Sequence, residues 1–282
     1  MQKRQFGSSG REVAVIGQGT WFIEQGEPSV TAAALRRGLD LGMTHIDTAE
    51  LYGAGAAEEL VGQAIAGRRD EVFIVSKVLP NHASREGVIG ACEASLARLG
   101  TDRLDCYLLH WRGEYPLEET IAGFEELQRH GKILSWGVSN FDVADLEEVR
   151  RIAGKGHPAC NQVLYHLQER AIENAVLPWC EGHGVAVVGY SPFGHKAGLP
   201  GHRTSRARVL TDIAAAHGAT VRQVVLAFLV RRPALFTIPK ASNPDHTADN
   251  AGAGDLGLSE EEIARIDEVF PLDRRARALP AL

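Results

Sequence analysis

The sequence predicts an α/β fold of the (β/α)8 TIM barrel class, and three observations support this prediction. Short β-rich segments recur along the chain, and each is followed by a segment whose apolar residues have helical spacing. Several of the β-rich segments are apolar at consecutive positions, as in 72–75 and 185–188, which is typical of parallel strands buried on both faces. Strand and helix alternate eight times without a long linker, which favours a closed barrel over an open sheet. We therefore expect one barrel domain over residues 1–282.

The barrel strands are predicted to begin after a short N-terminal hairpin. Residues 4–13 contain a Ser-Ser-Gly turn, which favours a β-hairpin that plugs the lower mouth of the barrel. The eight barrel strands are expected at residues 13–17, 43–47, 72–78, 104–110, 133–139, 160–165, 185–190 and 235–240.

The helices between these strands are marked at their ends. Thr220 with Gln223 and Ser259 with Glu262 both fit the capping box of a helix start. The gap before the eighth strand is longer than the others. It contains a Gly- and Pro-rich loop at residues 191–202 and two extra helices near the C-terminus, at about 204–217 and 220–231. Glycine follows the predicted helix ends, where a left-handed cap is often needed, at Gly42, Gly67, Gly100, Gly131, Gly184 and Gly218.

Composition and charge argue against several classes of protein. The chain is 44% hydrophobic and 23% charged, which are ordinary globular values. A net charge of −6 argues against a nucleic-acid partner, whose binding surface is basic. The polar N-terminus lacks the apolar core of a signal peptide, and no apolar run is long enough to cross a bilayer. We expect a cytoplasmic monomer with no membrane partner.

The cysteines and histidines show no metal-binding pattern. The four cysteines form no Cys-x-x-Cys pair, and no His-Glu-x-x-His motif occurs. Widely spaced cysteines of this kind are typical of a reduced chain with small buried thiols. We therefore expect neither a metal site nor a disulfide framework.

Four ionisable side chains fall at or just beyond three neighbouring strand ends. Asp47 ends the second strand, Lys77 lies near the end of the third and His110 ends the fourth, while Tyr52 follows Asp47 on a loop. Active sites of such barrels are built at the carboxyl ends of the strands. A free tyrosine has a pKa of about 10, and a lysine cation nearby favours the phenolate and lowers that pKa. Asp47 is expected to balance the lysine charge. His110 is expected to hydrogen-bond the phenolic oxygen of Tyr52 or to orient a substrate carbonyl.

This combination predicts a phenol tuned for general acid catalysis, which protonates an oxygen as hydride reaches a carbonyl carbon. Each residue alone has a plainer interpretation, such as a loop aromatic, a strand-end cap, a surface lysine or a core histidine. Their coincidence at three successive strand ends favours the catalytic interpretation.

Several segments resemble the aldo-keto reductases. They are residues 38–49 (GLDLGMTHIDTA), 50–53 (ELYG), 76–77 (SK) and 104–111 (LDCYLLHW). The likeness extends from the N-terminal hairpin to about Phe270. It implies a barrel that reduces aldehydes and ketones to alcohols with NAD(P)H, in which Tyr52 is the acid and Asp47, Lys77 and His110 assist it.

The resemblance also implies where the cofactor lies, because a Rossmann Gly-x-Gly-x-x-Gly fingerprint is absent. Lys240 meets the 2′-phosphate, Ser242 and Asn243 donate hydrogen bonds, and Asn250 lies near the adenine. His246 stands where many members have an arginine, which narrows the preference for NADPH over NADH. The other expected cofactor contacts are Ser139, Asn140 and Gln162 at the carboxamide, Tyr190 stacked on the nicotinamide, Ser191 and Phe193 along the pyrophosphate, and Gly19, Thr20, Trp21, Asp47 and Ile238.

The substrate is expected to be a small or polar aldehyde, a 2-oxoaldehyde or a sugar-derived carbonyl. Trp21 and Trp111 follow strands one and four and are expected to wall its pocket, which the short segment 271–282 leaves open. Loop 191–202 is expected to fold over the bound cofactor. Two alternatives stay open: a non-catalytic, nucleotide-sensing subunit of the same fold, and a barrel aldolase or isomerase that uses Lys77 as a Schiff base.

Overall fold

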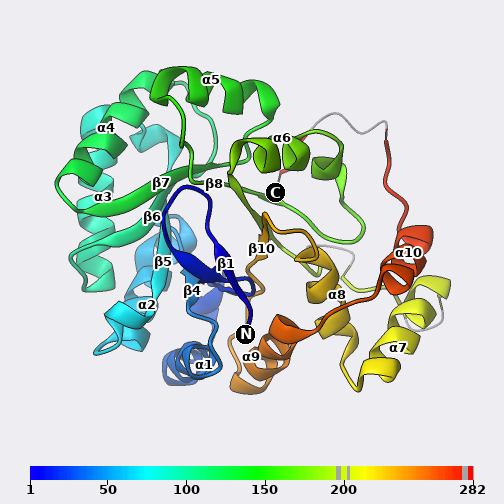
Figure 1. Ribbon diagram of the computed structural model, residues 1–282. Helices are drawn as coiled ribbons and strands as arrows, with labels where there is room; N and C mark the ends of the chain where they lie inside the picture. The colour runs from blue at the N-terminus through cyan, green and yellow to red at the C-terminus, as the bar shows by residue number, and fades with distance from the viewer. Residues whose placement is uncertain (195–197, 202–203, 275–278, 282) are drawn as a thin grey trace.

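Eight parallel strands form one curled sheet with helices around its outside (Figure 1). The computed structural model describes residues 1–194, 198–201, 204–274 and 279–281. Neighbouring strands along the sheet are consecutive in the sequence: β3 (Gln18–Gly19), β4 (His45–Asp47), β5 (Phe73–Val78), β6 (Leu104–Leu109), β7 (Ile133–Ser139), β8 (Cys160–Leu164), β9 (Ala186–Tyr190) and β10 (Leu235–Thr237).

The sheet closes where its first and last strands meet. Parallel bridges join Ile16 to Thr237 and Gly19 to Lys240, and the Gly17 amide donates to the Thr237 carbonyl at 2.8 Å. A Cβ on Gly19 would lie 2.5 Å from the carbonyl oxygen of Ile238, so only glycine fits this close approach. The predicted (β/α)8 barrel class is confirmed.

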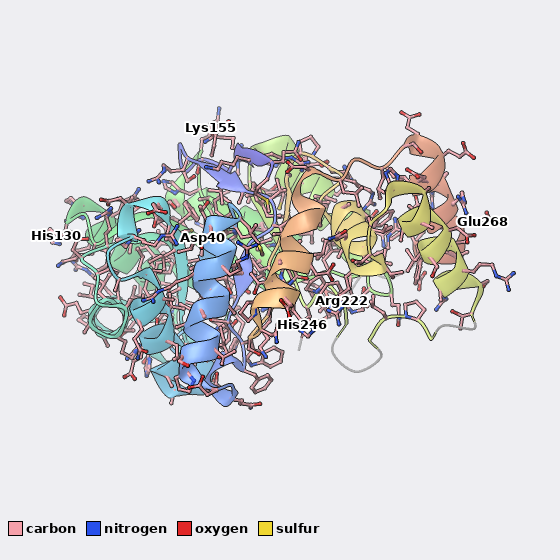
Figure 2. The ribbon with its side chains drawn as sticks, turned by 90° about the horizontal axis from the view of Figure 1, so that it is seen from below. Asp40, His130, Lys155, Arg222, His246 and Glu268 are labelled. Carbon is pink, nitrogen blue, oxygen red and sulfur yellow. The ribbon has the colours of Figure 1, made fainter. Side chains whose placement is uncertain are left out.

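The helices follow the strands in the expected alternation. In the outer ring α1 and α9 lie side by side (Figures 1 and 2), and α10 packs against α7. The α-helices are α1 (Pro28–Asp40), α2 (Ala56–Ile65), α3 (Arg85–Leu99), α4 (Leu117–Arg129), α5 (Val143–Ala153), α6 (Val176–His183), α7 (Ser205–His217), α8 (Val221–Leu229), α9 (Pro244–Ala251) and α10 (Glu260–Val269). Short 3-10 helices lie at Ile23–Gln25, Tyr52–Gly55, Arg69–Glu71, Pro80–His82, Ala171–Asn174 and Gly252–Asp255.

The predicted helix signals are present in the structure. Capping boxes begin α8 at Thr220 and α10 at Ser259, with Gln223 and Glu262 reaching back to the cap residues. The glycines predicted at helix ends all have positive φ, at Gly42, Gly67, Gly100, Gly131, Gly184 and Gly218. The two extra helices between the seventh and eighth predicted strands are α7 and α8.

The N-terminal hairpin covers the amino ends of the barrel strands. β1 (Lys3–Gln5) pairs antiparallel with β2 (Glu12–Ala14), with Arg4 opposite Val13. Phe6 in the connecting turn is fully buried, and its ring lies 4.9 Å from Phe73 and 5.1 Å from Phe236, centroid to centroid. The predicted hairpin and its position at the lower mouth are confirmed.

The first predicted barrel strand is wrong in its limits. Residues 13 and 14 of the predicted segment 13–17 belong to hairpin strand β2, and the barrel strand is β3 at Gln18–Gly19, preceded by the bridge at Ile16. Val13 and Ile16 are both buried, so the apolar run continues from one element into the next without a sequence boundary. The other seven strands begin and end within three residues of the predicted limits.

None of the helices within the described ranges is long and apolar enough to span a bilayer.

Replacing Phe6 tests the contribution of the plug. Phe6→Ala is expected to lower the free energy of unfolding by about 3–5 kcal/mol, because it removes a fully buried ring and leaves a cavity between Phe73 and Phe236. Urea denaturation followed by circular dichroism measures the change. Gln5→Ala, in the exposed neighbour, is the control and should shift stability by less than about 0.5 kcal/mol. Equal small effects for both variants would show that the hairpin is not part of the cooperative core.

Candidate active site

A buried lysine lies at the base of the site. Lys77, on β5, has no exposed surface, and its Nζ donates to Asp47 Oδ1 at 2.6 Å, the Thr48 carbonyl at 2.8 Å and Tyr52 OH at 3.1 Å. An ammonium has three protons, so these acceptors use its full donor capacity. The parallel register of β4 and β5 brings Asp47 and Lys77 to the same end of the barrel.

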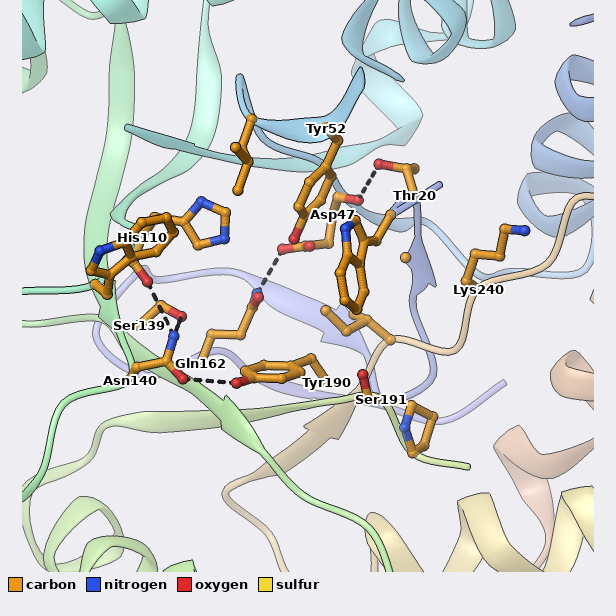
Figure 3. Close-up of a pocket in the computed structure, with 16 residues that line it drawn as sticks. Thr20, Asp47, Tyr52, His110, Ser139, Asn140, Gln162, Tyr190, Ser191 and Lys240 are labelled. Atoms are coloured by element: carbon orange, nitrogen blue, oxygen red, sulfur yellow. Dashed lines mark hydrogen bonds between the residues drawn. The ribbon is translucent and has the colours of Figure 1, made fainter. Parts of the chain in front are cut away.

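Asp47 is held from both sides (Figure 3). Its Oδ2 accepts from Gln162 Nε2 of β8 at 2.6 Å, and its carbonyl accepts from Thr20 Oγ1 at 2.9 Å. Gln162, expected at a carboxamide, therefore also orients the carboxylate across the barrel. Burial alone would lower the pKa of Lys77, but the electrostatic interactions and hydrogen bonds with Asp47 and Tyr52 outweigh it and the pKa is raised. Lys77 is thus an ammonium at neutral pH.

The expectation of an unusually acidic Tyr52 is wrong. Burial raises the pKa of Tyr52 above its usual 10, and the nearby Lys77 charge only partly opposes this. The phenol is therefore protonated at neutral pH. A phenol of this kind can donate a proton, and the Lys77 ammonium 3.1 Å away would stabilise the phenolate.

His110 follows β6 and faces Tyr52 edge to face, with ring centroids 5.7 Å apart. Burial, with a smaller contribution from the Lys77 charge, lowers the pKa of His110 to about 2. The imidazole is therefore neutral and can donate or accept one hydrogen bond. Its Nδ1 is buried and has no hydrogen-bond partner among the described residues.

These groups border a cavity of about 220 Å³ at the carboxyl ends of the strands (Figure 3). Trp21 and Trp111, the two expected substrate contacts, both line it. Lys77 is not among the described residues that line it, because Asp47 and Tyr52 cover its Nζ. The lining residues are Gly19, Thr20, Trp21, Asp47, Leu51, Tyr52, His110, Trp111, Ser139, Asn140, Gln162, Tyr190, Ser191, Pro192, Ile238 and Lys240.

One wall of the cavity combines amides, a hydroxyl and an aromatic ring. Tyr190 OH donates to Asn140 Oδ1 at 2.9 Å, and Asn140 Nδ2 donates to Ser139 Oγ at 3.1 Å and to the His110 carbonyl at 3.2 Å. Asn140 and Ser191 have φ values of 61° and 53°, unusual for residues other than glycine. A flat ring bearing a carboxamide matches this set, because the amides both donate and accept and the Tyr190 ring offers a stacking face.

Five of the expected cofactor contacts lie outside the cavity lining. Phe193 stacks under the guanidinium of Arg222, Ser242 accepts from Lys240 Nζ at 3.3 Å, and Asn243 caps α9. His246 is exposed in the first turn of α9, and Asn250 is buried in its last turn. Most of these residues follow strands β9 and β10, beyond the end of the cavity that Pro192 and Lys240 line. Residues 195–197 and 202 of the predicted cofactor loop lie outside the described residues.

Sequence reasoning missed the group that supports the loop with Tyr52. Glu58 of α2 is fully buried and accepts from Ser76 Oγ at 2.5 Å and Arg98 Nε at 2.6 Å. It thereby ties the helix after Tyr52 to the strand residue before Lys77. A signal was available, since Glu58 lies three residues before Val61 on the apolar face of its helix. Leu51 and Pro192, which line the cavity, were also missed.

Comparisons with known proteins agree with this geometry. The model of the aldo/keto reductase family matches residues 15–270. The methylglyoxal reductase YeaE of Escherichia coli (strain K12) is 43% identical over 282 residues, covering 99% of each chain. The glyoxal reductase of Bacillus subtilis (strain 168) is 34% identical, covering 92% of this chain and 90% of its own.

Among solved structures, an aldo/keto reductase from Klebsiella pneumoniae in complex with NADP and acetate superposes with a TM-score of 0.94. It is 44% identical, and the match covers 100% of both chains. The family match, these identities and the shared barrel lead to one conclusion. This chain belongs to the aldo/keto reductase family.

Proposed function

We propose that this protein reduces small aldehydes and ketones to alcohols with NADPH, using Tyr52 as the proton donor. The observation that supports the proposal most directly is the buried chain from Asp47 through Lys77 to the Tyr52 hydroxyl at the base of the cavity. The printed names of the relatives, a methylglyoxal reductase and a glyoxal reductase, support the reaction class. The NADP in the similar Klebsiella structure supports the cofactor.

The residues present fit a nicotinamide cofactor. Asn140, Ser139 and Gln162 would hold the carboxamide, and Tyr190 would stack on the ring. Lys240 with Ser242 would hold the 2′-phosphate, which favours NADPH over NADH. When bound, NADPH supplies the hydride that no amino acid side chain can provide.

The proton added to the carbonyl oxygen comes from a side chain of the protein. As hydride adds to the carbonyl carbon, the carbonyl oxygen gains negative charge and takes the proton of Tyr52 OH. The phenolate that remains lies 3.1 Å from the Lys77 ammonium, which stabilises it. The neutral His110 imidazole donates a hydrogen bond to the same oxygen and orients the carbonyl.

The substrate is inferred to be a 2-oxoaldehyde such as methylglyoxal. A cavity of about 220 Å³ shared with a nicotinamide ring leaves room for a small carbonyl compound. Trp21, Trp111 and Leu51 give the mouth an apolar border.

The Schiff-base alternative is not favoured. Such a lysine must be neutral and must reach its substrate, whereas Lys77 has a raised pKa, no exposed surface and three oxygen partners. The nucleotide-sensing alternative differs from ours in one measurable respect, which is turnover of a carbonyl substrate.

Replacing Tyr52 by Phe is expected to lower kcat for methylglyoxal by about 10²–10⁴-fold, the usual contribution of a general acid, and to leave NADPH binding intact. Absorbance of the reduced cofactor measures turnover, and fluorescence measures binding. Tyr115→Phe removes the same hydroxyl from an exposed tyrosine outside the cavity lining and should be neutral. No turnover in the wild-type protein would favour the sensor alternative. Borohydride trapping of substrate on Lys77 would favour the aldolase.

The expected pH dependence of the reaction follows from the shifted pKa values of Tyr52 and His110. Reduction requires protonated Tyr52, whose folded-state pKa lies above 10, so kcat should be flat from about pH 6 to 9 and fall only at higher pH. Alcohol oxidation requires the phenolate and should rise over the same high range. His110, with a pKa of about 2, should give no inflection near 6.5. A wild-type inflection between pH 6 and 9 that disappears in Tyr52→Phe would contradict the raised pKa of Tyr52.

A substrate panel tests the inferred size limit. With NADPH saturating, kcat/KM for methylglyoxal should exceed that for a bulky polycyclic ketone by at least about tenfold, because a cavity of about 220 Å³ shared with a nicotinamide ring leaves little room for the larger ketone. Trp111→Ala should narrow the ratio by opening the mouth. Preference for the polycyclic ketone in the wild-type protein would rule out this substrate class.

A further inference from the structure

Among the described residues, the lining of the cavity has less positive charge than its proposed ligand has negative charge. A dinucleotide has a doubly charged pyrophosphate between its two nucleosides, and NADPH adds a 2′-phosphate. Lys240 is the one charged basic side chain among the described residues that line the cavity, because His110 is neutral. If Lys240 contacts the 2′-phosphate, no other cation among the described lining residues remains for the pyrophosphate.

Arg222 lies beside the segment where the pyrophosphate is expected. Its guanidinium carbon is 4.6 Å from the ring centroid of Phe193, one residue beyond the cavity-lining Pro192. Arg222 is exposed, and within the described ranges no carboxylate forms an ion pair with it. Its charge is therefore available to a ligand, while the cation–π contact holds the guanidinium at the loop after β9.

The fold places Arg222 at the carboxyl ends of the barrel strands, which is the end where the cavity lies. Helices of this fold run opposite to the strands, so the first turn of α8 lies at the carboxyl ends of β9 and β10. The start of α8 is also fixed to α9, because Thr220 Oγ1 donates to Asp249 Oδ1 at 2.8 Å and Gln223 Nε2 donates to the Asp249 carbonyl at 3.0 Å. Figure 2 shows Arg222 and His246 on the side of the molecule opposite to Lys155.

We propose that Arg222 is a cofactor-binding residue that contacts the pyrophosphate, with its guanidinium held in place by Phe193. The inference rests on the proposed NADPH-dependent function. It divides the charges between two residues: Lys240 serves the 2′-phosphate and Arg222 serves the part that NADPH and NADH share. Arginine suits this position because its planar group stacks on a ring and donates to two phosphate oxygens at once.

The test measures binding, not turnover. Dissociation constants for NADPH and NADH are obtained from quenching of tryptophan fluorescence at several salt concentrations. Arg222→Gln should weaken both cofactors by a similar factor, about tenfold, and should reduce the salt dependence of binding. Arg222→Lys should restore part of the affinity. Lys240→Met should weaken NADPH alone.

Matched controls separate the outcomes. Arg129→Gln removes the same charge from the last turn of α4, at the other end of the barrel, and should leave both affinities unchanged. Unchanged binding in Arg222→Gln would overturn the proposal, as would a loss confined to NADPH, which would place Arg222 at the 2′-phosphate. A loss with unaltered salt dependence would also overturn it, because it would indicate loop packing alone. If the wild-type protein binds neither cofactor, the proposed function itself fails.

Discussion

The buried ammonium of Lys77 is the constraint on which the rest of the site depends. A charge without exposed surface is tolerated only when its protons all have acceptors, and here Asp47, Thr48 and Tyr52 supply them. Asp47 is held in turn by Gln162 from the opposite side of the barrel. The network therefore links β4, β5, β8 and the loop with Tyr52. Removing the Asp47 carboxylate would leave an uncompensated buried charge, so the geometry around Tyr52 and the stability of the barrel are coupled.

Backbone strain gathers at the same end of the barrel. Among the described residues, the non-glycine residues with positive φ are Phe22, Ala54, Asn140 and Ser191, and all four lie on segments that contribute lining residues to the cavity. Each such conformation costs about 1–3 kcal/mol and persists only where surrounding contacts impose it. The structure shows these contacts at two positions: Tyr190 bonds Asn140, and Glu58 anchors the helix that follows Ala54. The rigid strands thus hold the site in a conformation that the loops alone would not adopt.

Much of the fold could be predicted from short stretches of sequence, because the signals for strands and helices lie within such stretches. The strand at Ile133–Ser139 was predicted to the residue, and both capping boxes are present. The limits of the first barrel strand were predicted wrongly because only tertiary pairing divides the apolar run between hairpin and barrel. The strand ends also brought Asp47, Lys77 and His110 together as expected, since parallel strands place their carboxyl ends on one rim.

Other features of the site depend on three-dimensional surroundings that a linear pattern does not encode. The contact of Gln162 with Asp47 joins residues 115 positions apart. The pKa of Tyr52 was predicted in the wrong direction because the neighbouring charge could be inferred from the sequence, whereas the depth of burial could not. The raised pKa of Tyr52 suits the proposed reaction. A phenol with a raised pKa stays protonated at neutral pH, and in the proposed reaction the ammonium beside it would stabilise the phenolate formed when the proton leaves. In the proposed reaction burial and charge would therefore act at different stages: burial favours the protonated phenol before the proton transfer, and Lys77 would stabilise the phenolate after it.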